Sequence, residues 1–134
     1  MGNVLVGLLF VAFVIGILFS LVLFNRGDTG RERVAKLLPS DFRPDISHRK
    51  GDTYVGFEKA NNRLVLVDWP HAKVLTPRDV LSLEPVHDSM LGITHHWLAI
   101  DVPDTDFPRY RIWFQFRGAK LDEWHRRLAE ICKK

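Results

Sequence analysis

The six histidines are the residues of this sequence best suited to bind a metal ion or to transfer protons near neutral pH. His95 and His96 are adjacent, so along a strand their side chains point to opposite faces and do not share a site. His87 and Asp88 would meet them only across a hairpin, and the sequence contains neither an HExxH motif nor a pair of cysteines. We therefore predict no metal site. A small metal enzyme built on the histidines between residues 87 and 96 remains the weakest alternative.

Candidate nucleophiles are equally sparse. Cys132, the single cysteine, has no activating residue beside it and falls among apolar residues, as buried free cysteines do. Ser82 and Ser89 lack the glycines of a nucleophile elbow, and no glycine-rich phosphate loop is present. The acids that follow Val102 lack the glycine and the terminal glutamate of a calcium loop. We predict a protein with no catalytic residues and no cofactor.

Two groups of basic residues have the chemistry to meet anionic lipid headgroups, which attract each nearby cation by about 1 kcal/mol. The first group consists of Arg26, Arg31, Arg33 and Lys36. A second, sparser group surrounds a predicted hairpin and consists of Arg49, Lys50, Lys59 and Arg63. A lipid-binding sensor is therefore the main alternative function. Nucleic acid is not an expected partner, because the net charge is only +3 and the basic residues form no dense stripe.

One predicted strand carries the best candidate for protein recognition. In residues 109–116, Arg109, Arg111 and Trp113 share one face of the strand. The other face, which we expect to meet the core, is formed by Tyr110, Ile112, Phe114 and Phe116. Tryptophan and arginine are enriched at the centres of protein interfaces. The alternative is that Trp113 is buried, either because the sheet packs on both faces or because the polar linker predicted at residues 26–49 covers it. We predict that these three residues bind a protein partner or a second copy of the chain.

The element that places these groups is an uncharged apolar run at residues 4–24, within a predicted transmembrane anchor at residues 1–25. Its 21 residues form a helix of roughly 30 Å, the thickness of the bilayer hydrocarbon. We expect an uncleaved anchor rather than a signal peptide, because no Lys or Arg precedes the run and no small-residue cleavage site follows it. Ala12, Gly16 and Ser20 recur every four residues and form a stripe on which a second membrane helix can pack.

The charges beside this run indicate its direction. Four cations follow it closely, whereas residues 1–3 carry no cationic side chain. By the positive-inside rule, the N-terminus lies outside and the C-terminal domain lies in the cytoplasm. A single cysteine fits a reducing compartment. We predict a single-pass protein of the bacterial inner membrane.

The remaining sequence predicts a polar linker at residues 26–49 and one mainly β (α+β) domain at residues 50–134. Short runs of alternating or apolar residues, bounded by Asn, Asp, Gly and Pro, predict antiparallel strands. A helical stripe then closes the chain. The predicted strands are 54–58, 63–69, 71–76, 79–86, 95–102 and 109–116, and the stripe is formed by Leu121, Trp124, Leu128 and Ile131.

This order of elements resembles the pleckstrin-homology-like fold, including bacterial PH-like and GRAM-like domains. The residues that carry the resemblance are 56–67, 76–84, the strand at 111–116 and the final helix. The resemblance implies an antiparallel barrel or sandwich capped by the C-terminal helix, with a seventh strand from residues 46–50 or 90–93. It also implies a scaffold that binds proteins or lipid headgroups.

The function expected from these features is a membrane-anchored, non-catalytic interaction or scaffold protein. Its cytoplasmic PH-like domain would bind a protein partner or another copy of the chain at the membrane. Such a protein acts by holding its binding surface at the membrane.

Overall fold

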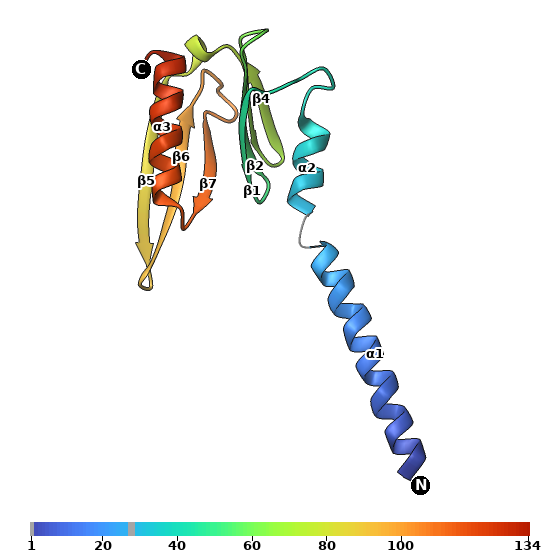
Figure 1. Cartoon of the computed structure of the whole chain (residues 1–134). Coiled ribbons are helices and arrows are strands. Elements are labelled where there is room, and N and C mark those ends of the chain that lie inside the picture. The colour runs from blue at the N-terminus through green and yellow to red at the C-terminus, as the bar shows by residue number, and fades with distance from the viewer. Residues whose placement is uncertain (1, 27–28) are drawn as a thin grey trace.

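The computed structural model describes residues 2–26 and 29–134, with side chains for residues 3–20 and 29–134. The first element is the helix α1, Gly2–Arg26, which extends away from the rest of the molecule (Figure 1). Its segment Asn3–Ser20 has a mean hydropathy of 2.6, and none of it is buried. At about 1.5 Å per residue the helix measures roughly 37 Å. It is long and apolar enough to span a membrane, as the sequence predicted.

A second helix, α2, spans Thr29–Leu37 and packs on the following domain. Val34 is only 2% exposed and belongs to a small apolar cluster with residues of the β2 and β3 strands. The other members of this cluster are Phe42, Tyr54, Val65 and Val67, with Leu37 and Leu38 packed against it. A segment predicted as linker is therefore, in part, a helix fixed to the domain.

Seven strands form two antiparallel sheets, one of four strands and one of three (Figure 1). The order within each sheet follows the chain. The first sheet contains β1 (Ile46–Lys50), β2 (Thr53–Glu58), β3 (Arg63–Asp68) and β4 (His71–Leu75). The second contains β5 (Ser82–Met90), β6 (Ile93–Asp101) and β7 (Arg109–Gln115), and the 3-10 turn η1 (Pro77–Asp79) joins the two. The extra strand is thus β1, which begins inside the predicted linker.

The C-terminal helix α3, Gly118–Cys132, closes the core between the sheets. Its apolar side chains belong to a core cluster to which strands of both sheets contribute, and Leu121 and Leu128 are fully buried. Trp124 and Cys132 are 5% exposed, and Ile131 packs at the edge of the same cluster. The predicted layout, an antiparallel α+β domain finished by an amphipathic helix, is confirmed at this level.

Side chains of the four-stranded sheet satisfy the backbone of β7, which lies at the edge of its own sheet. Asp68 accepts a hydrogen bond from the Arg111 N–H at 3.2 Å, and Thr53 Oγ1 accepts one from the Trp113 N–H at 3.1 Å. His48 Nε2 donates to the Trp113 carbonyl at 2.8 Å. Burial raises the pKa of Asp68 and lowers that of His48. These three bonds join the two sheets and leave fewer unpaired groups on the β7 edge.

One detail of the predicted strand pattern is wrong. Phe116 was expected to face the core with Ile112 and Phe114, but its side chain is 60% exposed. Gln115 adopts a left-handed φ of 53° and ends the strand. The alternation of side chains therefore stops one residue before Phe116, and the ring turns out of the core.

Candidate functional site

The outer face of the three-stranded sheet carries an aromatic pair, in which Trp113 is exposed and Trp97 is half-buried. Trp113 on β7 is paired in register with Trp97 on β6, and their ring centroids lie 5.1 Å apart at 43°. The Trp113 side chain remains 36% exposed, so neither the linker nor a second layer covers it. His95 adds a third ring, 6.3 Å from that of Trp113. We call Trp97, Trp113 and Arg111 the aromatic face.

The two predicted arginines of this strand differ in how far they are engaged. Arg109 donates to both carboxylate oxygens of Asp101, from Nε at 2.7 Å and from Nη2 at 3.1 Å. This pair raises the pKa of Arg109 and lowers that of Asp101. The Arg111 side chain is exposed beside Trp113 and makes no ion pair within the part of the chain that the structure describes. Of the predicted recognition residues, Arg111 and Trp113 are therefore the two most available to a partner.

Trp97 is the member of this face that sequence reasoning did not identify. Its strand was predicted, but only the pairing between strands places it directly opposite Trp113. The same register places Val86 of β5 opposite Trp97, which extends the surface across the whole sheet. Local periodicity assigns a residue to a face but does not reveal its neighbour on the next strand.

The predicted packing stripe of α1 is open. Ser20 Oγ donates to the Gly16 carbonyl at 2.8 Å, so the serine hydroxyl is satisfied within its own helix. A Cβ placed on Gly16 would meet nothing within 4 Å. Ala12, Gly16 and Ser20 are exposed and accessible to another helix.

The predicted juxtamembrane cations lie on α2 where the structure describes them. Arg33 is 3.7 Å from the Asp52 carboxylate, and its guanidinium lies 5.5 Å from the centre of the Trp69 ring. Arg31 and Lys36 lie on exposed positions of the same helix. The side chain of Arg26 lies outside the described residues. Part of this positive charge is therefore used to hold α2 against the domain.

The second group of predicted headgroup ligands does not form one site. Arg49 and Lys50 end β1, whereas Lys59 and Arg63 lie at the turn between β2 and β3. Because β2 runs between these two turns, its six residues separate the pairs by roughly 20 Å.

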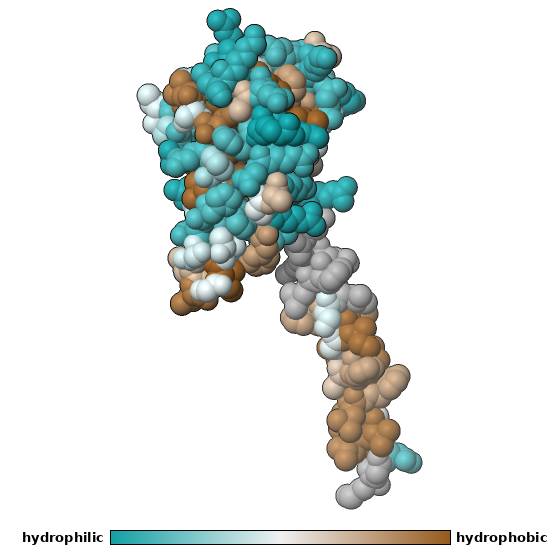
Figure 2. All heavy atoms as spheres, turned by 60° about the vertical axis from the view of Figure 1, so that its left-hand side comes forward, coloured by the Kyte–Doolittle hydropathy of each residue, from teal (hydrophilic) through white to brown (hydrophobic). Residues whose placement is uncertain are grey.

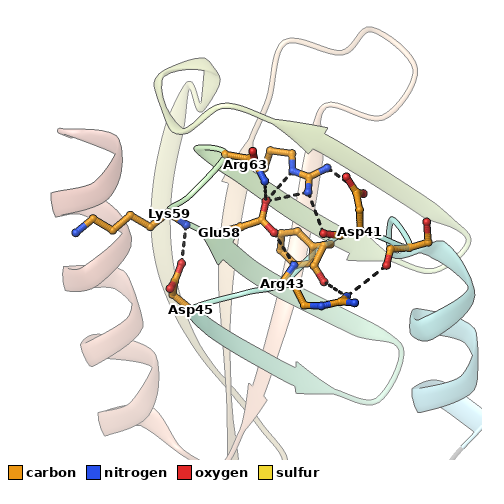
Figure 3. Close-up of polar contacts among 9 residues, drawn as sticks. Asp41, Arg43, Asp45, Glu58, Lys59 and Arg63 are labelled. Carbon is orange, nitrogen blue, oxygen red and sulfur yellow. Dashed lines mark hydrogen bonds and ion pairs between the residues drawn. The ribbon is translucent and has the colours of Figure 1, made fainter.

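Arg63 belongs instead to a structural network around Glu58, shown in Figure 3. The Glu58 carboxylate accepts hydrogen bonds from the Arg43 N–H at 2.5 Å, from Asn61 Nδ2 at 2.8 Å and from Arg63 Nε at 2.9 Å. Arg63 also reaches Asp41 at 3.3 Å. These bonds lower the pKa of Glu58 to about 2, with the Arg43 bond the largest cause. The network ties the segment before β1 to the β2–β3 hairpin.

Arg49 and Lys50 have other neighbours. They line an open pocket of about 380 Å³ together with Arg117 and Lys120, which come from the turn into α3 and from its first residues. The remaining lining residues are His48, Phe114, Gln115 and Phe116. We call Arg49, Lys50, Arg117 and Lys120 the basic pocket. Sequence reasoning missed Arg117 and Lys120, because nearly seventy positions separate them from β1 and no local pattern marks them.

His87 and His96 meet across the β5–β6 hairpin. His87 and His96 share a hydrogen bond between their Nδ1 atoms at 2.6 Å, and His87 Nε2 lies 3.6 Å from Asp122. His95 points to the opposite face, near the Phe116 ring at 5.8 Å. Within the described residues, no group of three or more His, Cys, Asp or Glu side chains is placed to hold a metal ion.

No protein-family model, curated protein or solved structure matches this chain. The resemblance to pleckstrin-homology-like domains therefore stays a prediction. The class that the fold itself defines is broader. It is an N-terminal helix apolar enough to span a membrane, followed by an α+β domain of two antiparallel sheets and a C-terminal helix.

Proposed function

We propose that this protein is a single-pass, membrane-anchored binding module without catalytic function, whose PH-like domain presents the aromatic face to a protein partner or to another copy of the chain. The observation that carries the proposal is the Trp97–Trp113 pair on a sheet face beside Arg111, in which Trp113 is exposed and Trp97 is half-buried. Two neighbouring tryptophans with an adjacent arginine have the composition of an interface hot spot. Each indole also loses little conformational entropy when a partner covers it.

The anchor supports this function by limiting where the domain can be. Only residues 27 and 28 separate α1 from α2, and α2 packs on the first sheet through Val34. A domain held this close to a bilayer meets other membrane-bound proteins at a high effective concentration. The cations that follow the apolar run support a cytoplasmic position for the domain. The membrane that holds the anchor is, in this proposal, the inner membrane of a bacterium.

The test is site-specific photo-crosslinking in intact bacterial cells with the full-length chain. A benzophenone amino acid replaces Arg111 in one variant and, as a matched control, Arg126 on the exposed side of α3. We expect a discrete crosslinked product from position 111 and none from position 126. Two epitope tags on co-expressed copies distinguish a second copy of the chain from another protein.

Adding Trp113→Ala to the position 111 variant should abolish the product, while the protein still fractionates with membranes after alkaline extraction. Resistance of the buried Cys132 to alkylation shows that the domain remains folded, because burial raises the pKa of this thiol to about 11. Equal crosslinking from both positions, or a product that survives Trp113→Ala, would refute the aromatic face as the binding site. Loss of the protein from the membrane fraction would refute the anchor.

A further inference from the structure

The hairpin of β5 and β6 extends beyond the rest of its sheet. The last pair between β6 and β7 joins His96 to Gln115, whereas β5 and β6 remain paired as far as Met90 and Ile93. The end of this overhang is apolar: Leu91 is 95% exposed, Met90 64% and Ile93 49%. In Figure 2, hydrophobic residues colour this lower end of an otherwise mainly hydrophilic domain. We call Met90, Leu91 and Ile93 the apolar tip.

The turn at this tip has an unusual sequence for its backbone. Leu91 and Gly92 both adopt positive φ, 53° and 78°, as the two central residues of a tight hairpin turn do. Asn or Asp before the glycine suits that conformation, whereas a leucine there is sterically disfavoured and exposes its whole side chain to water. An exposed leucine in this conformation favours neither folding nor solubility, and together with Met90 and Ile93 it forms an apolar group of the kind that marks a contact site.

The basic pocket lies at the same end of the domain as the tip. Phe116, 60% exposed at the rim of the pocket, has its ring 5.8 Å from that of His95 at the base of the overhang. Lys50, Arg117 and Lys120 each lower the pKa of His48, and none of the three pairs with a carboxylate of the described residues. The first turn of α3 contains no acidic residue, and no side chain caps the start of the helix. The helix dipole therefore adds to the positive potential at the basic pocket.

This end of the domain is also the end next to the apolar helix. Gly30 of α2 packs so closely on the Gly51 carbonyl that a Cβ on Gly30 would collide with it. Gly51 directly follows Lys50 of the basic pocket, and Gly30 is four residues from Arg26, where α1 ends. Four residues reach at most about 14 Å. Figure 1 shows α1 and the β5–β6 hairpin extending from the same end of the domain.

We propose that the apolar tip and the basic pocket form a second membrane contact, which docks the domain on an anionic bilayer. The tip enters the interfacial region, and the four cations of the pocket bind lipid phosphates beside it. This inference rests on the proposed anchoring by α1 and goes beyond the proposed protein-binding function. Docking would fix the orientation of the domain and hold the aromatic face at a set angle to the membrane.

Three observations favour a bilayer as the occupant of this surface. The surface combines exposed apolar side chains with Lys50, Arg117 and Lys120, which pair with no carboxylate of the described residues. This composition matches the apolar interior and anionic headgroups of a lipid leaflet. Its Lys50 side adjoins the packing contact of Gly51 with Gly30, which is four residues from the end of α1, so the membrane that α1 enters lies close to this surface. Because α1 already holds the domain at the bilayer, the tip and the pocket meet lipid at a high effective concentration, and weak individual interactions suffice.

The test uses the full-length chain, reconstituted in vesicles of phosphatidylcholine alone or mixed with phosphatidylglycerol. Leu91→Cys is labelled with an environment-sensitive fluorophore, and the parent chain shows that the buried Cys132 takes up no label. We expect blue-shifted emission, quenched by spin-labelled lipid, in the anionic vesicles only. Raising the salt to 1 M shortens the screening length to about 3 Å and should reverse the shift.

Arg117→Glu should abolish the shift and the quenching in anionic vesicles. Lys59→Glu is the matched control, because it makes the same charge change at the β2–β3 turn, at the far end of β2. It should leave both signals unchanged. A negative charge at position 117 is favourable at the start of α3, so loss of folding does not explain the expected effect.

The remaining outcomes separate the two proposals. An unshifted probe on protein that floats with the vesicles overturns the docking and leaves the anchor intact, whereas protein that does not float overturns the anchor as well. Equal quenching in neutral vesicles overturns headgroup binding by the pocket. A blue shift that lipid-borne spin labels do not quench means that protein covers the tip, and overturns the bilayer as its occupant.

Discussion

The hydroxyl of Thr53 allows a direct test of how the two sheets are joined, because a single substitution removes one hydrogen bond between them. Thr53 is 1% exposed, donates to the Lys50 carbonyl at 2.8 Å and accepts from the Trp113 N–H at 3.1 Å. Valine has almost the same shape, so Thr53→Val removes these two bonds and little else. The Trp113 N–H would lose its partner in the edge of β7.

The size of the effect follows from the cost of an unpaired buried group, about 1–3 kcal/mol. Because the Trp113 N–H is only partly buried, we expect the lower half of this range, about 1–2 kcal/mol. For a domain of this size, each kcal/mol lowers the melting temperature by about 4–8 °C. Thr53→Val should therefore melt roughly 5–15 °C below the parent.

The assay is thermal unfolding of the full-length protein in detergent, followed by tryptophan fluorescence. Thr53→Ser is the control, because it keeps the hydroxyl and should retain most of the stability. Hydrogen exchange at the Trp113 amide should quicken in Thr53→Val more than exchange in α3. If Thr53→Val is as stable as Thr53→Ser, the hydroxyl does not join the sheets and the reasoning fails.

Two further predictions concern pH, and both are read from the urea midpoint across a pH series. Burial lowers the pKa of His48 below its ordinary value of 6.5, so its contribution to stability is complete above pH 6.5 and is lost as the pH falls toward the folded-state pKa. His48→Gln can still donate to the Trp113 carbonyl and should remove this pH dependence; an unchanged profile would contradict the assignment. Glu58, with its pKa lowered from 4.5 to about 2, stabilises the fold above pH 4.5 and loses this effect between pH 4.5 and 2. Glu58→Gln should be less stable than the parent at neutral pH and equal to it near pH 2, and a constant difference between them would count against the carboxylate.

Several elements were predictable because their signal is local. The uncharged run of α1 needs only hydropathy and length to be recognised. In β7, Tyr110, Ile112 and Phe114 are buried while Arg109 and Arg111 are exposed, as strict alternation predicts. The helical stripe of α3 depends likewise on spacing within one segment.

The elements between α1 and β2 were harder to predict. β1 has the sequence ISHRK, in which only His48 is buried, so it lacks the apolar alternation by which strands are recognised. Its strand conformation is set by pairing with β2, from Ile46–Phe57 to Lys50–Thr53. α2 is a mostly polar helix of nine residues whose single buried residue, Val34, needs the first sheet to pack on. Short elements of this kind are stabilised by tertiary contacts more than by their own propensity.

The sequence by itself determined the apolar helix, the α+β domain behind it, and the sharing of one strand face by Arg111 and Trp113. Only the tertiary structure decided which side chains from distant segments meet. It set Trp97 beside Trp113, brought Arg49 and Lys50 to Arg117 and Lys120, and left Leu91 exposed at the end of an overhanging hairpin. The physical reason is that periodicity within a segment specifies a face, whereas neighbours across strands depend on register and on how two sheets close around one core.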